Sequence, residues 1–179
     1  MRTINKLNLL LKRVEDYLAY VACAAYLFMV ISMSFDALGR YLFDNPIPGV
    51  YEFNIFYAFP IIVYLGLSYT YREKAHIAID IIFDRVSEKK QDIMSITSSL
   101  LVSVVSFLLF VQTGGRFLKS YNINEVYVGI YDFPLYIGYL AIVIGFLFLF
   151  IRSGFDLFFL IYHKVRNGDT DKHSNIISE

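Results

Sequence analysis

Four long stretches without a charged residue dominate this chain of 179 residues. They cover residues 17–35, 53–71, 93–115 and 133–151. Each has at least about 19 residues, which is the length that an α-helix needs to cross roughly 30 Å of hydrocarbon. Because little more than two ends and three connections remain, we expect an all-α integral membrane protein with four transmembrane helices. Such a chain has almost no room for a soluble catalytic domain.

The composition agrees with a membrane protein. Hydrophobic residues make up 57% of the chain and the mean hydropathy is +0.53, whereas soluble domains are roughly 45–50% apolar. The formal net charge is zero and the basic residues are scattered, so we expect no binding of nucleic acid. Cys23 is the only cysteine, which excludes a framework of disulfides within the chain.

We place the four helices at about residues 17–40, 51–72, 91–118 and 134–163, within one transmembrane domain of residues 1–167. Residues 168–179 form a polar C-terminal tail that we expect to be disordered. The first helix is not expected to be a cleaved signal peptide. Glu15 and Asp16 separate the basic residues from the apolar stretch, and that stretch is too long for a signal sequence.

Basic residues concentrate on one side of this topology. Twelve lie in the N-terminal segment, the second connection and the C-terminal tail, and three lie in the first and third connections. Lys and Arg prefer the cytoplasmic side of short loops. We therefore expect four crossings with both termini in the cytoplasm.

Two segments outside the spans have the pattern of amphipathic helices on the membrane surface. Residues 2–16 space apolar side chains at helical intervals, and an N-terminal extension of the first helix explains them equally well. In the second connection one helical face would be apolar and another polar. Its apolar face holds Ile79, Ile82, Phe83 and Val86, and its polar face holds His76, Asp80 and Asp84.

Charged residues near the hydrocarbon rarely face lipid. Arg40 and Glu52 bracket the short first outer connection, and we expect an ion pair that pins the first two helices together. Arg152 and Asp156 are four residues apart, deep in the fourth apolar segment. We interpret them first as an ion pair within the helix near the inner interface. A contact across to another helix or subunit is the alternative, and an ion relay is the least favoured.

Residues that disturb helices occur in two of the spans. Pro60 lies in the middle of the second span and leaves the carbonyl of Phe56 without its helical partner, which predicts a kink. Gly114 and Gly115 near the end of the third span predict close packing or a break.

Catalytic, metal and cofactor chemistry finds no support in the sequence. The three histidines, His76, His163 and His173, all lie outside the apolar stretches, so a haem-binding membrane bundle is excluded. No Cys/His cluster has the spacing of metal ligands. His76 and Asp80 are favoured as a structural pair over a catalytic dyad. We therefore expect no enzyme activity, no metal and no cofactor.

Several motifs follow one another in a recognisable order. These are Arg40-Tyr41-Leu42-Phe43, Pro46, Glu52, Gly66 with Arg72, and His76-Ile77-Ala78-Ile79-Asp80. In this order within four helices they resemble the DctQ-like small membrane subunit of TRAP transporters, over nearly the full chain. Family members commonly have Trp or a second acidic residue near Glu52 and a Gly before the His. Here Tyr51 and Phe53 flank Glu52, and Ala75 precedes His76.

The resemblance implies a bacterial inner-membrane protein in a sodium-driven uptake system for organic acids. Its partners would be a large multi-helix M-type permease subunit, a periplasmic solute-binding protein and membrane lipids. The solute would be a sialic acid or a C4-dicarboxylate, with a slight preference for sialic acid. Arg40, Glu52, His76 and Asp80 would be structural or interface residues, and Arg152 and Asp156 join them as candidates. A membrane anchor for another complex and an autonomous small transporter are the competing hypotheses.

Overall fold

The computed structural model describes residues 2–73, 88–129 and 131–177. The described elements are α1 (Arg2–Phe43), α2 (Val50–Phe53), the π-helix η1 (Asn54–Ala58), α3 (Phe59–Arg72), α5 (Glu88–Asn122), β1 (Val126–Val128), β2 (Asp132–Pro134) and α6 (Leu135–Ile177). Four spans among them are long and apolar enough to cross a membrane: Lys6–Phe43, Val50–Arg72, Ile93–Asn122 and Leu135–Ile161. The prediction of an all-α protein with four spanning helices is confirmed.

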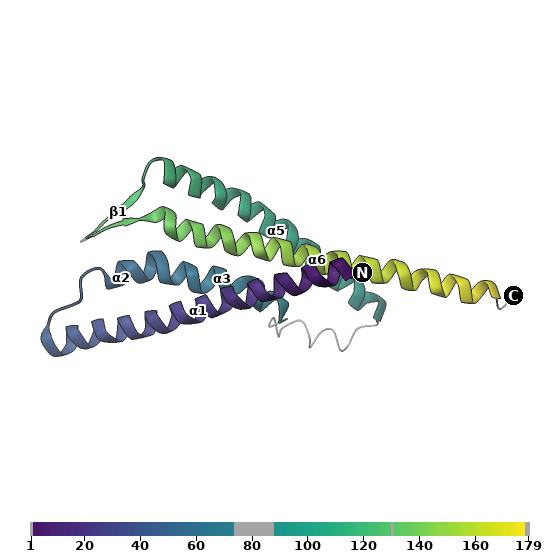
Figure 1. Cartoon of the computed structure of the whole chain (residues 1–179), viewed down its shortest axis with the longest axis horizontal. Helices are drawn as coiled ribbons and strands as arrows, with labels where there is room; N and C mark the ends of the chain where they lie inside the picture. Colours follow the sequence, from purple (N-terminus) through teal and green to yellow (C-terminus); the bar gives the residue numbers. More distant parts are fainter. Residues whose placement is uncertain (1, 74–87, 130, 178–179) are drawn as a thin grey trace.

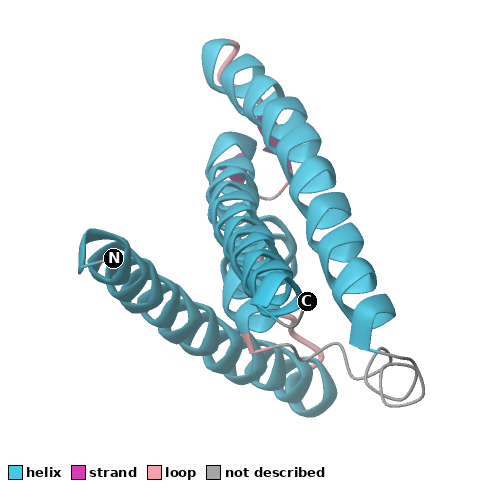
Figure 2. Ribbon diagram, turned by 90° about the vertical axis from the view of Figure 1, so that its right-hand side faces the viewer, coloured by secondary structure: helices cyan, strands magenta, loops and turns pink. Residues whose placement is uncertain are grey.

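The helices form an open row. α1 packs on α3, α3 packs on α6, and α6 packs on α5. Figure 1 shows this order, and the end-on view in Figure 2 places α1 and α5 on opposite sides of the central pair. Both chain ends lie away from the β-hairpin. We call the two ends of the row the hairpin end and the termini end.

α1 is one continuous helix, so the separate surface helix considered for residues 2–16 is absent from the described chain. α1 is continuous because the side of it that faces α3 carries a regular row of packed residues. Its buried or half-buried residues recur at alternating spacings of four and three, which is the spacing of a helix–helix seam. They are Leu11, Glu15, Leu18, Ala22, Ala25, Met29, Ser32 and Asp36. Because this seam begins at Leu11, packing holds the N-terminal segment in line with the span.

α6 also extends beyond its expected end. It continues to Ile177, so residues 168–177, expected to be a disordered tail, are helical. No proline interrupts this segment, and a polar sequence without proline can continue a helix that has already formed. The second surface helix was predicted within residues 74–87. That prediction, with His76 and Asp80, lies outside the described residues.

The bend predicted at Pro60 takes the form of a π-helical turn. In η1 the amide of Phe59 donates to the carbonyl of Asn54, five residues earlier, and Pro60 follows at the start of α3. Proline has no amide hydrogen to donate, so the helix must change its hydrogen-bond pattern just before it.

Close packing of helices occurs at different glycines from those predicted. A methyl group added at Gly114 or Gly115 would meet no neighbouring atom within 4 Å, and α5 runs through both residues unbroken. Gly138 and Gly145 of α6 instead lie against the backbone of the neighbouring span. A methyl group on Gly145 would come within 2.7 Å of the carbonyl carbon of Tyr64. These two glycines allow α3 and α6 to approach closely.

A short antiparallel hairpin closes the third connection, where the sequence indicated only a polar link. β1 pairs with β2 so that Val126 lies opposite Pro134. The hydroxyl of Tyr57 donates to the carbonyl of Pro134 at 3.0 Å. Arg116 at the end of α5 pairs with Glu125 at 3.2 Å. The hairpin is thereby fixed to both the second and the third span.

Candidate functional site: polar contacts at the two ends of the helix row

A carboxylate without exposed surface lies where α1 meets α3 and α6, at the termini end. Glu15 is fully buried. Its Oε1 accepts a hydrogen bond from Ser68 Oγ at 2.7 Å. Its Oε2 accepts from Arg72 Nη1 at 3.2 Å and lies 3.9 Å from Arg152 Nη1. These four residues, Glu15, Ser68, Arg72 and Arg152, are named here the Glu15 cluster.

The two arginines of the Glu15 cluster have further partners around it. Arg72 pairs with Asp16 at 2.6 Å and with Glu73 at 3.1 Å. Arg152 pairs with Asp156 at 3.5 Å and donates to the side-chain oxygen of Asn8 at 3.1 Å. Both arginine side chains are about nine-tenths buried. Buried charge is tolerated at this depth because every charged group has an opposite partner.

Helical spacing brings these groups together. Ser68 and Arg72 are four residues apart and share one face of α3, and Arg152 and Asp156 share one face of α6 in the same way. Glu15 occupies a position of the α1 seam, between Leu11 and Leu18. Three helices thus present matching polar groups at one level of the row. Both interpretations of Arg152 hold, since it pairs within α6 and also reaches α1.

Because Arg152 contacts both α6 and α1, its substitution should lower the stability of the chain through both sets of contacts. Arg152→Leu removes the ion pair with Asp156 and takes one cation away from Glu15. We expect the single variant to lose about 2–4 kcal/mol of unfolding free energy. Arg152→Leu with Asp156→Leu should recover only part of this loss, because Asn8 and Glu15 still lack Arg152. Melting temperatures of the two variants in mild detergent test this, and full recovery in the double variant would contradict the contact with α1.

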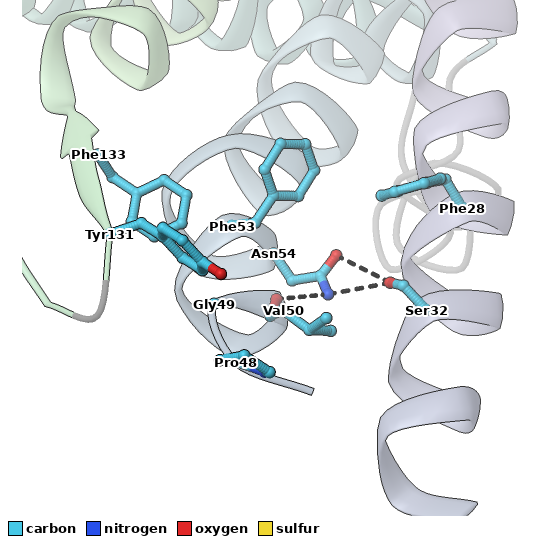
Figure 3. Close-up of a pocket in the computed structure, with 9 residues that line it drawn as sticks. All are labelled: Phe28, Ser32, Pro48, Gly49, Val50, Phe53, Asn54, Tyr131 and Phe133. Carbon is cyan, nitrogen blue, oxygen red and sulfur yellow. Dashed lines mark hydrogen bonds between the residues drawn. The ribbon is translucent and has the colours of Figure 1, made fainter. Parts of the chain in front are cut away.

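Asn54 makes the main polar contact between spans at the hairpin end. Its side chain is fully buried, and Nδ2 donates to Ser32 Oγ at 3.0 Å and to the carbonyl of Val50 at 2.9 Å. Ser32 in turn donates to the carbonyl of Met29. Figure 3 shows the Asn54 amide turned toward Ser32, and both residues help to line an open apolar groove of about 230 Å³. Phe28 of α1 lies at one side of this groove, and Tyr131 and Phe133 lie at the other.

Asn54→Leu should weaken the attachment of η1 to α1. The substitution removes both donors, so the carbonyl of Val50 loses its side-chain partner. We expect a loss of about 1–3 kcal/mol in unfolding free energy. Ser32→Ala removes one partner only and should cost less. Thermal unfolding of both variants in detergent tests the ranking, and an Asn54→Leu variant as stable as the parent would contradict it.

Arg40 does not pair with Glu52, so that prediction is wrong. Arg40 pairs with Asp36, one turn earlier on α1. Asp36 is only 4% exposed, and its Oδ1 accepts from the amide of Ile47 at 2.8 Å. Asp36 thus fixes the first connection to the end of α1 and holds Arg40 on its own helix. Within the described chain Glu52 is half-buried and forms no ion pair.

Sequence reasoning missed the centre of the termini-end contacts. Glu15 was taken only as a charge preceding the first span, and Arg72 was taken as a basic residue of the second connection and as part of the motif series, without a partner. A usable signal was present, because Glu15 falls on the apolar seam of its helix, seven residues before Ala22. An acidic residue on a buried stripe predicts a cationic partner on a neighbouring helix. Asn54, an amide within an apolar span, gave a weaker indication of a polar contact between helices.

A model of one family matches the chain over residues 29–160, which is well over half of its length. That family is described as "Tripartite ATP-independent periplasmic transporters, DctQ component". The chain belongs to the DctQ family. A DctQ chain is a component of a transporter rather than an enzyme, and the four apolar spans make this one a multi-pass protein of the inner membrane. The matched region includes Asp36, Asn54, Arg72 and Arg152, whereas Glu15 lies before it.

One curated relative supports the assignment. It is a protein of Haemophilus influenzae described as a TRAP transporter small permease protein. The two sequences are 25% identical over 144 residues, which cover 79% of this chain and 86% of the relative. This agrees with the resemblance drawn from the motifs of the first connection and the second span.

Proposed function

We propose that this DctQ chain is a static scaffold subunit of a TRAP transporter. In this role it packs on a large M-type membrane subunit and supports sodium-coupled uptake of an organic acid. A periplasmic solute-binding protein delivers the solute to the complex. The path of the solute and the sodium sites belong to the large subunit.

The observation that carries this proposal is an open row of helices that is locked at both ends. The row buries few large apolar residues and leaves many exposed on α1 and α5, so it offers long faces to lipid or to a partner. The Glu15 cluster joins three helices at the termini end. Asn54 and Tyr57 join the spans at the hairpin end. Such a row is suited to hold its shape while a partner moves.

Autonomous transport is less well supported. A transporter usually binds its solute near the middle of the bilayer, between broken helices. In the described spans the ionised side chains gather near the two ends of the row, and most of them are paired with one another. A membrane anchor for an unrelated complex is disfavoured because the chain belongs to a transporter family.

The solute and the orientation belong to the same proposal. We propose a sialic acid first and a C4-dicarboxylate second. Both termini are assigned to the cytoplasm from the bias of twelve basic residues against three. The location of both chain ends away from the hairpin accords with an even number of crossings.

Co-purification tests the scaffold role. The chain carries the only tag and is expressed with the membrane protein encoded beside it, then extracted in mild detergent. We expect a stoichiometric complex with a large polytopic subunit. A chain that purifies alone, folded and stable, would contradict the proposal.

A further inference from the structure

One tyrosine hydroxyl lies at the middle of the first span without a described partner. Tyr26 is ten residues from Asp16 and ten from Asp36, which places it about 15 Å along the helix from each charged boundary. Its side chain is 55% exposed. Among the described residues none accepts a hydrogen bond from its hydroxyl. With Asp16 and Asp36 taken as the two charged limits of the span, the hydroxyl lies within the hydrocarbon.

A hydroxyl in hydrocarbon without an acceptor is unfavourable. The other exposed polar side chains of α1 avoid this problem. Ser34 donates to the carbonyl of Val30 within its own helix at 2.7 Å. Tyr17 and Tyr20 lie closer to the termini end, and side chains on a helix lean toward its N-terminus, so their hydroxyls point toward the interface. Tyr26 therefore requires an acceptor from outside this chain.

Tyr26 belongs to a second stripe on α1, beside the seam that faces α3. This stripe also recurs at alternating spacings of four and three and includes three small residues. It consists of Ala19, Cys23, Tyr26, Val30, Met33, Ala37 and Arg40. We name it the Tyr26 stripe. Met33, Ala37 and Arg40 line a hollow of about 410 Å³ near its end.

Arg40 adds a charged group to this stripe. Its side chain is 64% exposed although it pairs with Asp36, so guanidinium donors remain open at the hairpin end. A partner helix that lies along the Tyr26 stripe would satisfy Tyr26 with a midspan acceptor and Arg40 with an acidic or carbonyl group. Small residues on the stripe allow the backbones to approach closely.

The other edge of the row has a different character. The middle of α5 exposes aliphatic and aromatic side chains, including Leu101, Val104 and Leu108. None of these has a polar group, so lipid tails can cover them without an unsatisfied donor. Gln112 is the exposed amide of this edge, but it lies only four residues from Arg116, whereas Tyr26 lies ten residues from the nearest charged residue of its span. Among the described residues of the two edges, the donor nearest the middle of the membrane is therefore on α1.

We propose that the Tyr26 stripe of α1 is the docking face for a transmembrane helix of the large subunit, and that the α5 edge faces lipid. The proposal rests on the scaffold function, because that function supplies the partner. The partner helix carries a hydrogen-bond acceptor at mid-membrane and an acceptor for Arg40 near the hairpin end.

Photocrosslinking of the full complex in membranes tests the face. A photoreactive phenylalanine derivative replaces Tyr26, Met33, Ile31 or Leu108, one position at a time. We expect crosslinks to the large subunit from Tyr26 and Met33, and none from Leu108 on α5. Crosslinks to the large subunit from Leu108 or Ile31 alone would contradict the Tyr26 stripe as the docking face, while leaving the scaffold function intact. Crosslinks from Tyr26 only to lipid or to a second copy of this chain would also overturn it.

Paired substitutions give a second readout. Ala37→Leu on the Tyr26 stripe should lower the yield of complex at least tenfold, whereas Ala24→Leu, exposed on the opposite side of α1, should leave it unchanged. Tyr26→Phe should weaken the complex about threefold, the loss expected for one interhelical hydrogen bond in a membrane. Equal yields for Ala37→Leu and Ala24→Leu would overturn the face. Absence of any complex with the parent chain would instead overturn the scaffold function.

Discussion

Glu15→Leu is expected to destabilise the chain more than any other single change at the termini end. Among the described residues, Glu15 is the carboxylate that contacts both Arg72 and Arg152, and both of these side chains are nearly buried. Breaking a buried ion pair by removing one partner typically costs about 3–5 kcal/mol. We expect a loss of this size in unfolding free energy, measured as a lower melting temperature and a lower yield of monodisperse protein in detergent.

Asp16 provides the matched control for Glu15. It is the next residue in α1 and pairs with the same Arg72, but its side chain is 44% exposed. Asp16→Asn should cost about 1 kcal/mol or less, because exposed ion pairs contribute little. Glu15→Gln, which keeps the shape and one acceptor, should fall between the two. If Glu15→Leu and Asp16→Asn melted at the same temperature, the buried cluster would not be a major source of stability.

Substitution of the close-packed glycines of α6 is the second change with a large expected effect. Gly145→Ala places a methyl group against the backbone of Tyr64, and Gly138→Ala places one against the carbonyl of Phe56. Backbone cannot move aside as a flexible side chain can, so α3 and α6 must separate. We expect about 1–3 kcal/mol of lost stability for each variant and a larger loss for the double variant.

Gly154 is the control for these glycines, because it lies on the same helix and a methyl group added there would have no neighbour within 4 Å. Gly154→Ala should stabilise the chain slightly, since alanine favours helix over glycine by about 0.5–1 kcal/mol. Gly145→Ala should therefore lower the melting temperature, whereas Gly154→Ala should raise it. A melting temperature for Gly145→Ala that is unchanged or raised, as for Gly154→Ala, would show that close approach at Gly145 is not required.

The spans could be predicted from the sequence because length and apolarity alone determine whether a helix can cross a membrane. The predicted limits were shorter than the helices, because packing at Leu11 and Glu15 continues α1 toward its N-terminus. A change in hydropathy marks the edge of the hydrocarbon, but a helix does not need to end there. The hairpin at Val126–Pro134 was missed because three-residue strands leave too short a pattern to recognise.

The polar contacts were harder to predict because pairing depends on helix rotation and order. Arg40 was assigned to Glu52 across the connection, but Asp36 lies one turn away on the same helix and requires no tertiary information. Arg152 was recognised as a charge within an apolar segment that pairs with Asp156, whereas its partners on α1 lie over 130 residues earlier in the sequence. A single sequence gives little indication of which helices are neighbours in an open row.

Uptake by vesicles tests the central claim most directly. Vesicles contain this chain alone, the large subunit alone, or both, each with the solute-binding protein, and uptake of labelled sialic acid and of a labelled C4-dicarboxylate is followed under an inward sodium gradient. The scaffold account predicts uptake only where both membrane subunits are present. Uptake by this chain alone, or undiminished uptake by the large subunit without it, would contradict the account.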